Sequence, residues 1–165
     1  MICNGFALLN KKPIKDMVTT KISAFGVTYG LGEAGYDIRI KQDITFLPHG
    51  SGGVVIDADR NVSRFSDNFV IASAIEEFDM PDDLVGIVHD KSSWARRGLS
   101  VFNTVIESGF KGGLTLELVY HGNEGLFIPA GSGIAQVIFH SIAEKASYSG
   151  KYQGQSTNPE PARES

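Results

Sequence analysis

The chain has 165 residues, 42% of them hydrophobic, which suffices for one domain with a buried core. A formal net charge of −4 argues against general nucleic-acid binding, and the single cysteine, Cys3, excludes an internal disulfide or a cysteine-rich zinc site. No apolar run reaches the roughly 18 residues that a membrane span needs, and no basic region precedes the first apolar patch. We therefore expect a soluble, cytoplasmic protein that binds neither nucleic acid nor a membrane.

The first half of the chain predicts short strands separated by turns. Residues 14–18 fit a short helical turn after Pro13, and the four glycines of 26–35 predict turns or close backbone approach. Alternating or continuous apolar runs then predict strands, with a flexible loop at 49–53. The expected strands are 36–40, 44–47, 54–56, 69–75 and 84–89.

The second half continues in the same way. Residues 92–97 predict a short helix with Ser92 as a plausible N-cap. Further strands are expected at 101–102, 114–120, 126–128 and 134–139. Many short strands between Gly and Pro turns indicate an all-β barrel or sandwich with little helix. The tail from Ala146 has few apolar residues, so we expect it to be mobile unless a ligand or neighbour orders it.

Two stretches offer chemistry. Lys91-Ser92-Ser93-Trp94-Ala95-Arg96 combines two hydroxyls and two cations at a helix start, which suits a phosphate chain but also describes a solvated basic turn. Strand alternation puts Glu117 on the face opposite Leu116 and Leu118. Glu117 is then either a solvated side chain or a general acid/base in an apolar cleft, where its pKa would be raised.

Three other features are less specific. Glu107 is either an ordinary turn acid or an acceptor that faces the same cleft. The four histidines are scattered and lack metal-ligand spacing, and the sequence contains neither the zinc deaminase signature nor a P-loop. The polar run 151–155 is either an ordinary tail or part of a ligand contact.

Several segments together resemble the dCTP deaminase branch of the dUTPase-like superfamily. Lys91-Ser92-Ser93-Trp94-Ala95-Arg96-Arg97-Gly98-Leu99 is similar to its Arg-Ser-Ser-Leu-Ala-Arg-x-Gly-Leu motif. Residues 109–118 are similar to Gly-Phe-x-Gly-x-Ile-Thr-Leu-Glu-Leu. Residues 34–39, 129–139 and 150–155 resemble the family's early strand, later strand and closing tail. The resemblance covers most of the chain, from about Gly35 to Gln155.

This resemblance implies an all-β fold, a distorted β-barrel of jelly-roll, dUTPase-like type with few short helices, assembled as a homotrimer with active sites between subunits. The barrel domain would span 1–150, and 151–165 would be a mobile tail that closes over the nucleotide, with the residues from about Asn158 dispensable. The implied activity is a zinc-free hydrolase reaction that removes the 4-amino group of dCTP. Mg²⁺ would arrive on the triphosphate, without metal ligands from the protein.

The resemblance also implies site residues. Glu117 would activate the water that attacks C4 of cytosine and carry a proton to the leaving ammonia, while Ser92 and Arg96 would hold that water and the charge of Glu117. The other expected substrate contacts are Lys91 and Ser93 to the phosphates, Glu107 to the sugar 3′-hydroxyl, Val105 to a base substituent, and Thr115, Gln136, Tyr148, Lys151, Tyr152 and Gln155 to the base or triphosphate.

One segment departs from the family pattern. Thr104-Val105-Ile106-Glu107-Ser108-Gly109 is two residues shorter than usual, with Glu for Asp and Ser for Pro. In the family this segment walls the pyrimidine near C4 and C5, so shortening predicts extra space there, with Val105 as an apolar surface. A 5-substituted dCTP such as 5-methyl-dCTP, giving dTTP, is therefore an expected substrate beside dCTP, which gives dUTP.

Two other functions stay open. The first is a dUTP diphosphatase, or a bifunctional deaminase/diphosphatase, in which an acid at Glu107 activates water. The second is a catalytically silent nucleotide-binding module. The combination of Glu117, Ser92 and Arg96 favours deamination over both.

Overall fold

The computed structural model describes residues 1–48, 54–58, 61–65 and 68–164. The loop expected at 49–53 lies outside these ranges. The structure is 46% strand and 8% helix, which confirms the all-β expectation. Among the described residues, no helix is long and apolar enough to cross a membrane.

The described elements follow in chain order: β1 (Ile2–Cys3), α1 (Gly5–Lys11), β2 (Ile22–Ala24), β3 (Val27–Leu31), β4 (Tyr36–Arg39), β5 (Asp43–Phe46), β6 (Val54–Ala58), β7 (Asn61–Phe65), β8 (Phe69–Asp79), β9 (Leu84–Asp90), α2 (Ser92–Ala95), β10 (Leu99–Val101), β11 (Val105–Ile106), β12 (Lys111–Tyr120), β13 (Leu126–Ile128) and β14 (Gly133–Ser141).

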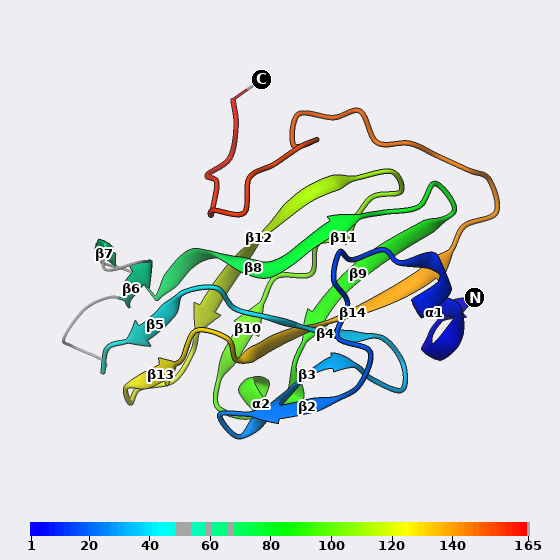
Figure 1. Ribbon diagram of the computed structural model, residues 1–165. Helices are drawn as coiled ribbons and strands as arrows, with labels where there is room; N and C mark the ends of the chain where they lie inside the picture. The colour runs from blue at the N-terminus through cyan, green and yellow to red at the C-terminus, as the bar shows by residue number, and fades with distance from the viewer. Residues whose placement is uncertain (49–53, 59–60, 66–67, 165) are drawn as a thin grey trace.

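The strands form three sheets rather than one closed barrel. The largest has the order β11-β9-β14-β4-β3-β2, with β1 also paired to β14. A second has the order β10-β12-β8, and the third β13-β5-β6-β7. Figure 1 shows α2 at one end of the molecule, and β12 and the C-terminal tail at the other.

One hydrophobic core joins these sheets. Its largest fully buried side chains include Trp94, Tyr36, Phe46, Phe78 and Phe139, which come from strands far apart in the sequence and from α2. Burying a large apolar side chain contributes about 1.5–3 kcal/mol, so these anchors fix the strands that carry the site.

The glycine-rich segment 26–35 makes the close backbone approaches expected of it. A Cβ on Gly30, whose φ is 92°, would lie 2.4 Å from the carbonyl oxygen of Thr20. A Cβ on Gly35 would lie 2.2 Å from that of Val137. The segment is not only turns, however, because β3 runs through it.

Two local expectations are wrong. Residues 14–18 do not form a helical turn: Ile14 makes an isolated β-bridge to Phe78, and the nearby helix is α1. Helix α1 has no side-chain N-cap bond and buries only Leu8, which explains its weak sequence signal. In α2 the N-cap position is Lys91, not Ser92, and no side chain caps it.

The C-terminal tail folds back over β12 (Figure 1). The amide of Gly154 donates to the carbonyl of Lys111 at 2.8 Å, and that of Gly113 donates to the carbonyl of Gln155 at 2.9 Å. The tail is therefore paired with the end of β12 in this conformation. Its mobility in solution stays a prediction.

Candidate active site

A cavity of about 670 Å³ lies where β8, β12 and the residues around β11 meet the tail. Its lining is mostly apolar, with a few carboxyl, hydroxyl and amide groups. The lining residues are Phe69, Val70, Ile71, Thr104, Val105, Ile106, Glu107, Phe110, Leu114, Thr115, Glu117, Tyr148, Tyr152, Gln155, Glu160, Pro161 and Ala162. We call this cavity the Glu117 pocket.

Strand register puts the central carboxylate in the pocket. On β12, Leu116 and Leu118 are buried in the core, and Glu117 projects from the opposite face, as the alternation predicts. Glu117 lies directly opposite Ile71 of β8. Cross-strand neighbours share a face, so an aliphatic side chain flanks the carboxylate.

Glu117 has surroundings that favour its protonated form. Burial raises the pKa of its carboxyl group, and a hydrogen bond from the Thr104 hydroxyl acts in the opposite direction. The Thr104 Oγ1 donates to Glu117 Oε2 over 3.4 Å. A carboxyl group with a raised pKa in an apolar pocket is suited to both accepting and donating a proton near neutral pH.

The shortened segment forms one wall of the pocket. Val105 and Ile106 make up β11, which pairs with β9 at Ile87 and Gly86. The Val105 side chain is 52% exposed, and the exposed Glu107 follows in the turn. Both residues line the pocket, so the wall supplies one apolar and one acidic surface.

The tail supplies the roof. Tyr148 packs edge-on against Phe110, with ring centroids 6.0 Å apart, and its amide donates to the carbonyl of Ser108. Gln155 is buried, and its Nε2 donates to the Thr115 hydroxyl oxygen at 2.5 Å. Tyr152 also lines the pocket. Three of the expected tail contacts therefore lie beside Glu117 in one chain.

Lys91 lies elsewhere, in a buried ion pair. Its Nζ donates to Asp37 Oδ2 at 2.5 Å and to Thr28 Oγ1 at 3.0 Å. The side chains of Lys91 and Asp37 are only 9% and 6% exposed. In this conformation the Lys91 ammonium is committed to Asp37 and is not directed at a phosphate.

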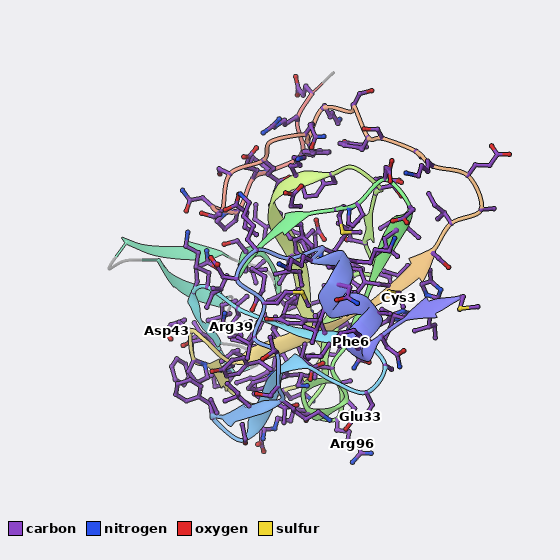
Figure 2. All side chains as sticks on the ribbon, turned by 45° about the vertical axis from the view of Figure 1, so that its right-hand side comes forward. Cys3, Phe6, Glu33, Arg39, Asp43 and Arg96 are labelled. Atoms are coloured by element: carbon purple, nitrogen blue, oxygen red, sulfur yellow. The ribbon has the colours of Figure 1, made fainter. Side chains whose placement is uncertain are left out.

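Helix α2 and the residue that follows it hold the other predicted residues of this motif. Trp94 anchors it, since its buried indole Nε1 donates to the carbonyl of Gly133 at 2.7 Å. Ser92 and Arg96 are exposed and Ser93 is half-buried. Figure 2 shows the Arg96 side chain extending away from the molecule, at the end opposite the tail.

Two further predicted residues are also outside the pocket lining. Gln136 on β14 lies opposite Asp37 of β4 and His89 of β9, which puts it on the side of the Lys91 ion pair. Lys151 is exposed, and its Nζ donates to the carbonyl of Arg163 at 2.6 Å.

One chain thus brings only part of the predicted site together. Seven residues line the Glu117 pocket: Val105, Glu107, Thr115, Glu117, Tyr148, Tyr152 and Gln155. The other six do not: Lys91, Ser92, Ser93, Arg96, Gln136 and Lys151. None of the described residues that line the pocket is Lys or Arg.

The sequence reading missed several lining residues. Thr104 could have been predicted, because it begins the segment that departs from the family pattern. Phe69 and Ile71 belong to a correctly expected strand, but their place depends on the β8–β12 register, which alternation alone does not give. The tail residues Glu160 and Pro161 carry no motif.

Within the described part of the chain, no three His, Cys, Asp or Glu side chains are grouped so as to hold a metal ion. A magnesium ion carried by a nucleotide does not need such a group, since Mg²⁺ commonly keeps waters and substrate phosphates as ligands.

The fold and the pocket define a mostly β protein with a cleft that combines an apolar wall, a half-buried carboxylate and a folded-back tail. The family model described as dCTP deaminase-like matches residues 8–142. The chain belongs to this family.

Curated relatives agree with this assignment. A dCTP deaminase of Campylobacter concisus is 34% identical over 164 residues, covering 89% of this chain and 88% of the relative. A dCTP deaminase of Campylobacter curvus is 36% identical over 146 residues, covering 78% of each.

Solved structures support the fold alone. The EIAV dUTPase superposes with a TM-score of 0.51 at 20% identity and covers 70% of this chain and 82% of its own. A dUTPase from the Staphylococcus aureus phage phi11 gives 0.52 at 14% identity, covering 72% and 84%. The expected dUTPase-like fold type is confirmed.

Proposed function

We propose that this protein deaminates dCTP, or a 5-substituted dCTP, by water attack assisted by Glu117. The observation that carries the proposal is the position of Glu117, half-buried beside Ile71 in a mostly apolar pocket of a dCTP deaminase-like chain. Pocket residues of matched pKa are the usual carriers of general acid–base chemistry.

The reaction needs one group that moves a proton twice. Glu117 accepts a proton from water as the water oxygen bonds to C4 of the cytosine ring. It passes this proton to N3 of the ring. It then takes the proton of the new 4-hydroxyl group and gives it to the 4-amino nitrogen as the C4–N bond breaks, which releases ammonia and leaves a uracil base. The raised pKa of Glu117 suits both steps, because a strongly acidic carboxyl group would be a poor base.

We propose that each complete site is shared between copies in a homotrimer. A triphosphate is normally held by Lys, Arg and hydroxyl groups, whereas the described lining of the Glu117 pocket offers carboxylates but no Lys or Arg. Helix α2, which contains Ser92 and Ser93, lies near the opposite end of the same chain (Figure 1), and so does Arg96 (Figure 2). A neighbouring copy that presents this end to the pocket supplies the missing cations, with Lys91 available once its pair with Asp37 rearranges.

Magnesium and zinc have different places in this proposal. Mg²⁺ enters with the triphosphate and neutralises part of its charge, and no residue of the chain is assigned as its ligand. Zinc has no role in the proposal, since the family resemblance implies a zinc-free reaction and the sequence lacks the zinc deaminase signature. Metal analysis of active protein, before and after chelation, tests both statements, because retained zinc that tracks with activity would contradict the second.

The shortened wall affects which cytosine base the pocket can accept. Val105 is half-exposed and lines the pocket from the segment that is two residues shorter than the family pattern. A methyl group at C5 would gain about 0.8 kcal/mol from apolar burial against such a wall. We therefore propose that 5-methyl-dCTP, which gives dTTP, is accepted at least as well as dCTP.

Parallel assays test these statements. The protein is incubated with dCTP, 5-methyl-dCTP and dUTP in Mg²⁺, and ammonia and pyrophosphate are followed separately. Ammonia without pyrophosphate is the expected result. Pyrophosphate from dUTP would support the alternative in which Glu107 activates water for diphosphate release, and a strong preference for dCTP over its 5-methyl form would reject the base proposal.

We also propose a cytoplasmic localisation. A dCTP-consuming enzyme would act in the cytoplasm, where its nucleotide substrate occurs. Cell fractionation followed by immunodetection checks this.

A further inference from the structure

At the N-terminal end of β12, two glycines let the backbone of the tail pack directly against the strand. Gly112 makes a parallel β-bridge to Gln155. A Cβ on Gly113 would lie 2.3 Å from the carbonyl oxygen of Ser156 and 2.7 Å from the Cα of Thr157. The tail therefore crosses this surface at a distance that only glycine permits.

The three atoms nearest to a Cβ at position 113 all belong to the tail. Gly113 does not have a positive φ, so an L-residue there meets no intrinsic backbone strain. The Cβ atom would collide only with Ser156 and Thr157 among the neighbours closest to it. A side chain at position 113 would therefore disturb the docking of the tail more than the pairing of the strands.

Lys41 holds the next part of the tail. It follows β4, and its amide donates to the carbonyl of Ser73, which faces Thr115 across the β8–β12 pair. Its Nζ donates to the Thr157 carbonyl at 3.0 Å, to the Thr157 hydroxyl at 3.2 Å and to Asn158 Oδ1 at 3.2 Å. An ammonium group has three donors, so the tail satisfies all of them.

The tail residues that follow the Lys41 contacts then reach the pocket. The amide of Glu160 donates to the Thr115 hydroxyl oxygen at 3.1 Å, and the Glu160 carboxylate pairs with Arg163. Glu160 and Pro161 line the Glu117 pocket. Anchoring at Thr157 and Asn158 thus holds the tail close to the point where Glu160 and Pro161 enter the pocket lining.

We propose that Lys41 and the Gly112–Gly113 pair form a docking site for the chain's own segment 153–158, which holds the tail over the Glu117 pocket before any nucleotide binds. Lys41 is a positioning residue in this scheme, since it acts through the tail and does not line the pocket. Its effect on substrate affinity rests on the proposed function, but the docking itself does not.

Hydrogen exchange of the nucleotide-free protein tests the docking directly. Lys41→Met removes three hydrogen bonds from a charged donor, so amides in 153–163 should exchange about tenfold faster. Lys41→Arg, which keeps a cation with several donors, should restore most of the protection. Lys21→Met is the matched control, because it also removes a lysine from an ion pair, but the partner of Lys21 is Glu33 on the surface instead of the tail.

A second variant approaches the same site without touching a charge. Gly113→Ala should abolish protection of 153–158, whereas Gly125→Ala should leave it unchanged, since a Cβ on Gly125 meets only ordinary contacts at 3.6 Å or more. Unchanged exchange of the tail in both Lys41→Met and Gly113→Ala would overturn the proposal. Faster exchange across the core strands as well would also overturn it, because the variants would then act on the whole fold.

Steady-state kinetics with dCTP separates the docking of the tail from its effect on substrate affinity. If the docked tail is the binding-competent form, Lys41→Met should raise KM about tenfold with a smaller change in kcat, and Lys41→Arg should reverse it. An unchanged KM beside faster tail exchange would overturn the link to the substrate. Absence of any deaminase activity in the parent protein would instead contradict the proposed function, and the exchange result would still decide the docking.

Discussion

At the scale of single residues, Glu117 is the proposed proton carrier, and its surroundings act on the pKa of its carboxyl group in opposite directions. Ile71 flanks it across the β8–β12 pair, and burial raises the pKa of the Glu117 carboxyl group. The Thr104 hydroxyl donates to the carboxylate and limits that rise. A backbone hydrogen bond from the Glu117 amide also lowers this pKa, so the net rise reflects burial opposed by one amide and one hydroxyl group.

Replacing Glu117 tests its role. Glu117→Gln should lower the rate of ammonia release by at least about 10²–10⁴-fold, because the amide keeps the shape but cannot accept a proton. Binding of dCTP, measured by calorimetry, should persist. Glu144→Gln, an exposed change in the segment before the tail, is the control. Near-normal turnover of Glu117→Gln would remove this residue from the mechanism.

Replacing Thr104 tests the balance. Thr104→Val removes the hydrogen bond that favours the charged carboxylate, so the pKa of Glu117 should rise further above its ordinary value of 4.5. The base form is then lost at a higher pH, and the acid limb of the kcat profile should move upward. The measurement is kcat from about pH 5 to 8.

The conservative variant Thr104→Ser keeps the hydroxyl and should leave the limb close to that of the parent protein. A limb that stays in place in Thr104→Val would mean that this hydrogen bond does not form during turnover, or that another group sets the limb.

At the scale of elements, the tail is more than an added lid. It pairs with β12, packs Tyr148 on Phe110 and reaches the pocket with Glu160 and Pro161. The expectation that residues from about Asn158 are dispensable did not include these contacts, so we revise it.

Stepwise truncation tests the revised view. Removal from Gly150 onward should raise KM and lower kcat strongly, because the Gln155 contact and the roof are both lost. A chain ending at Asn158 should show a smaller rise in KM, since it keeps the Lys41 contacts but loses Glu160. A chain ending at Arg163 is the control. Full activity of the chain ending at Asn158 would restore the original expectation.

At the scale of the whole molecule, the predicted site is divided between two ends of one chain. The pocket at the tail end contains the carboxylates, whereas Ser92 of α2 and the following residue, Arg96, lie at the other end (Figures 1 and 2). In the proposed trimer, each copy would present its α2 end to the pocket of its neighbour, where the Arg96 cation and the pocket carboxylates would complete one site.

Mixing two inactive variants tests this division. Glu117→Gln and Arg96→Gln should each abolish turnover alone. After the subunits are mixed at equal amounts by unfolding and refolding, about a quarter of the sites should contain both intact residues, if assembly is random. Ammonia release at about that fraction of the parent rate is expected, together with a trimer in light scattering. No recovery in mixed trimers would contradict a shared site, and an active monomer of 17.8 kDa would contradict the trimer.

Several features were determined by the sequence itself. The alternation around Glu117 defines which face of β12 it occupies, because strand geometry has a period of two. The glycines of 26–35 predict close approach, and Gly30 and Gly35 make it. The motif around Ser92 and the tail motif indicate the family, which the family match confirms.

Other features depend on tertiary structure, because they join residues that are distant in sequence. The β8–β12 register sets Ile71 beside Glu117, and local alternation carries no information about that pairing. The capture of Thr157 by Lys41 spans 116 residues and involves a lysine with no motif. Helix α1 has too few buried residues to give a periodic signal. The separation of Glu117 from Arg96 could emerge only from the folded chain, since the two lie 21 positions apart in one sequence but face opposite ends of the molecule.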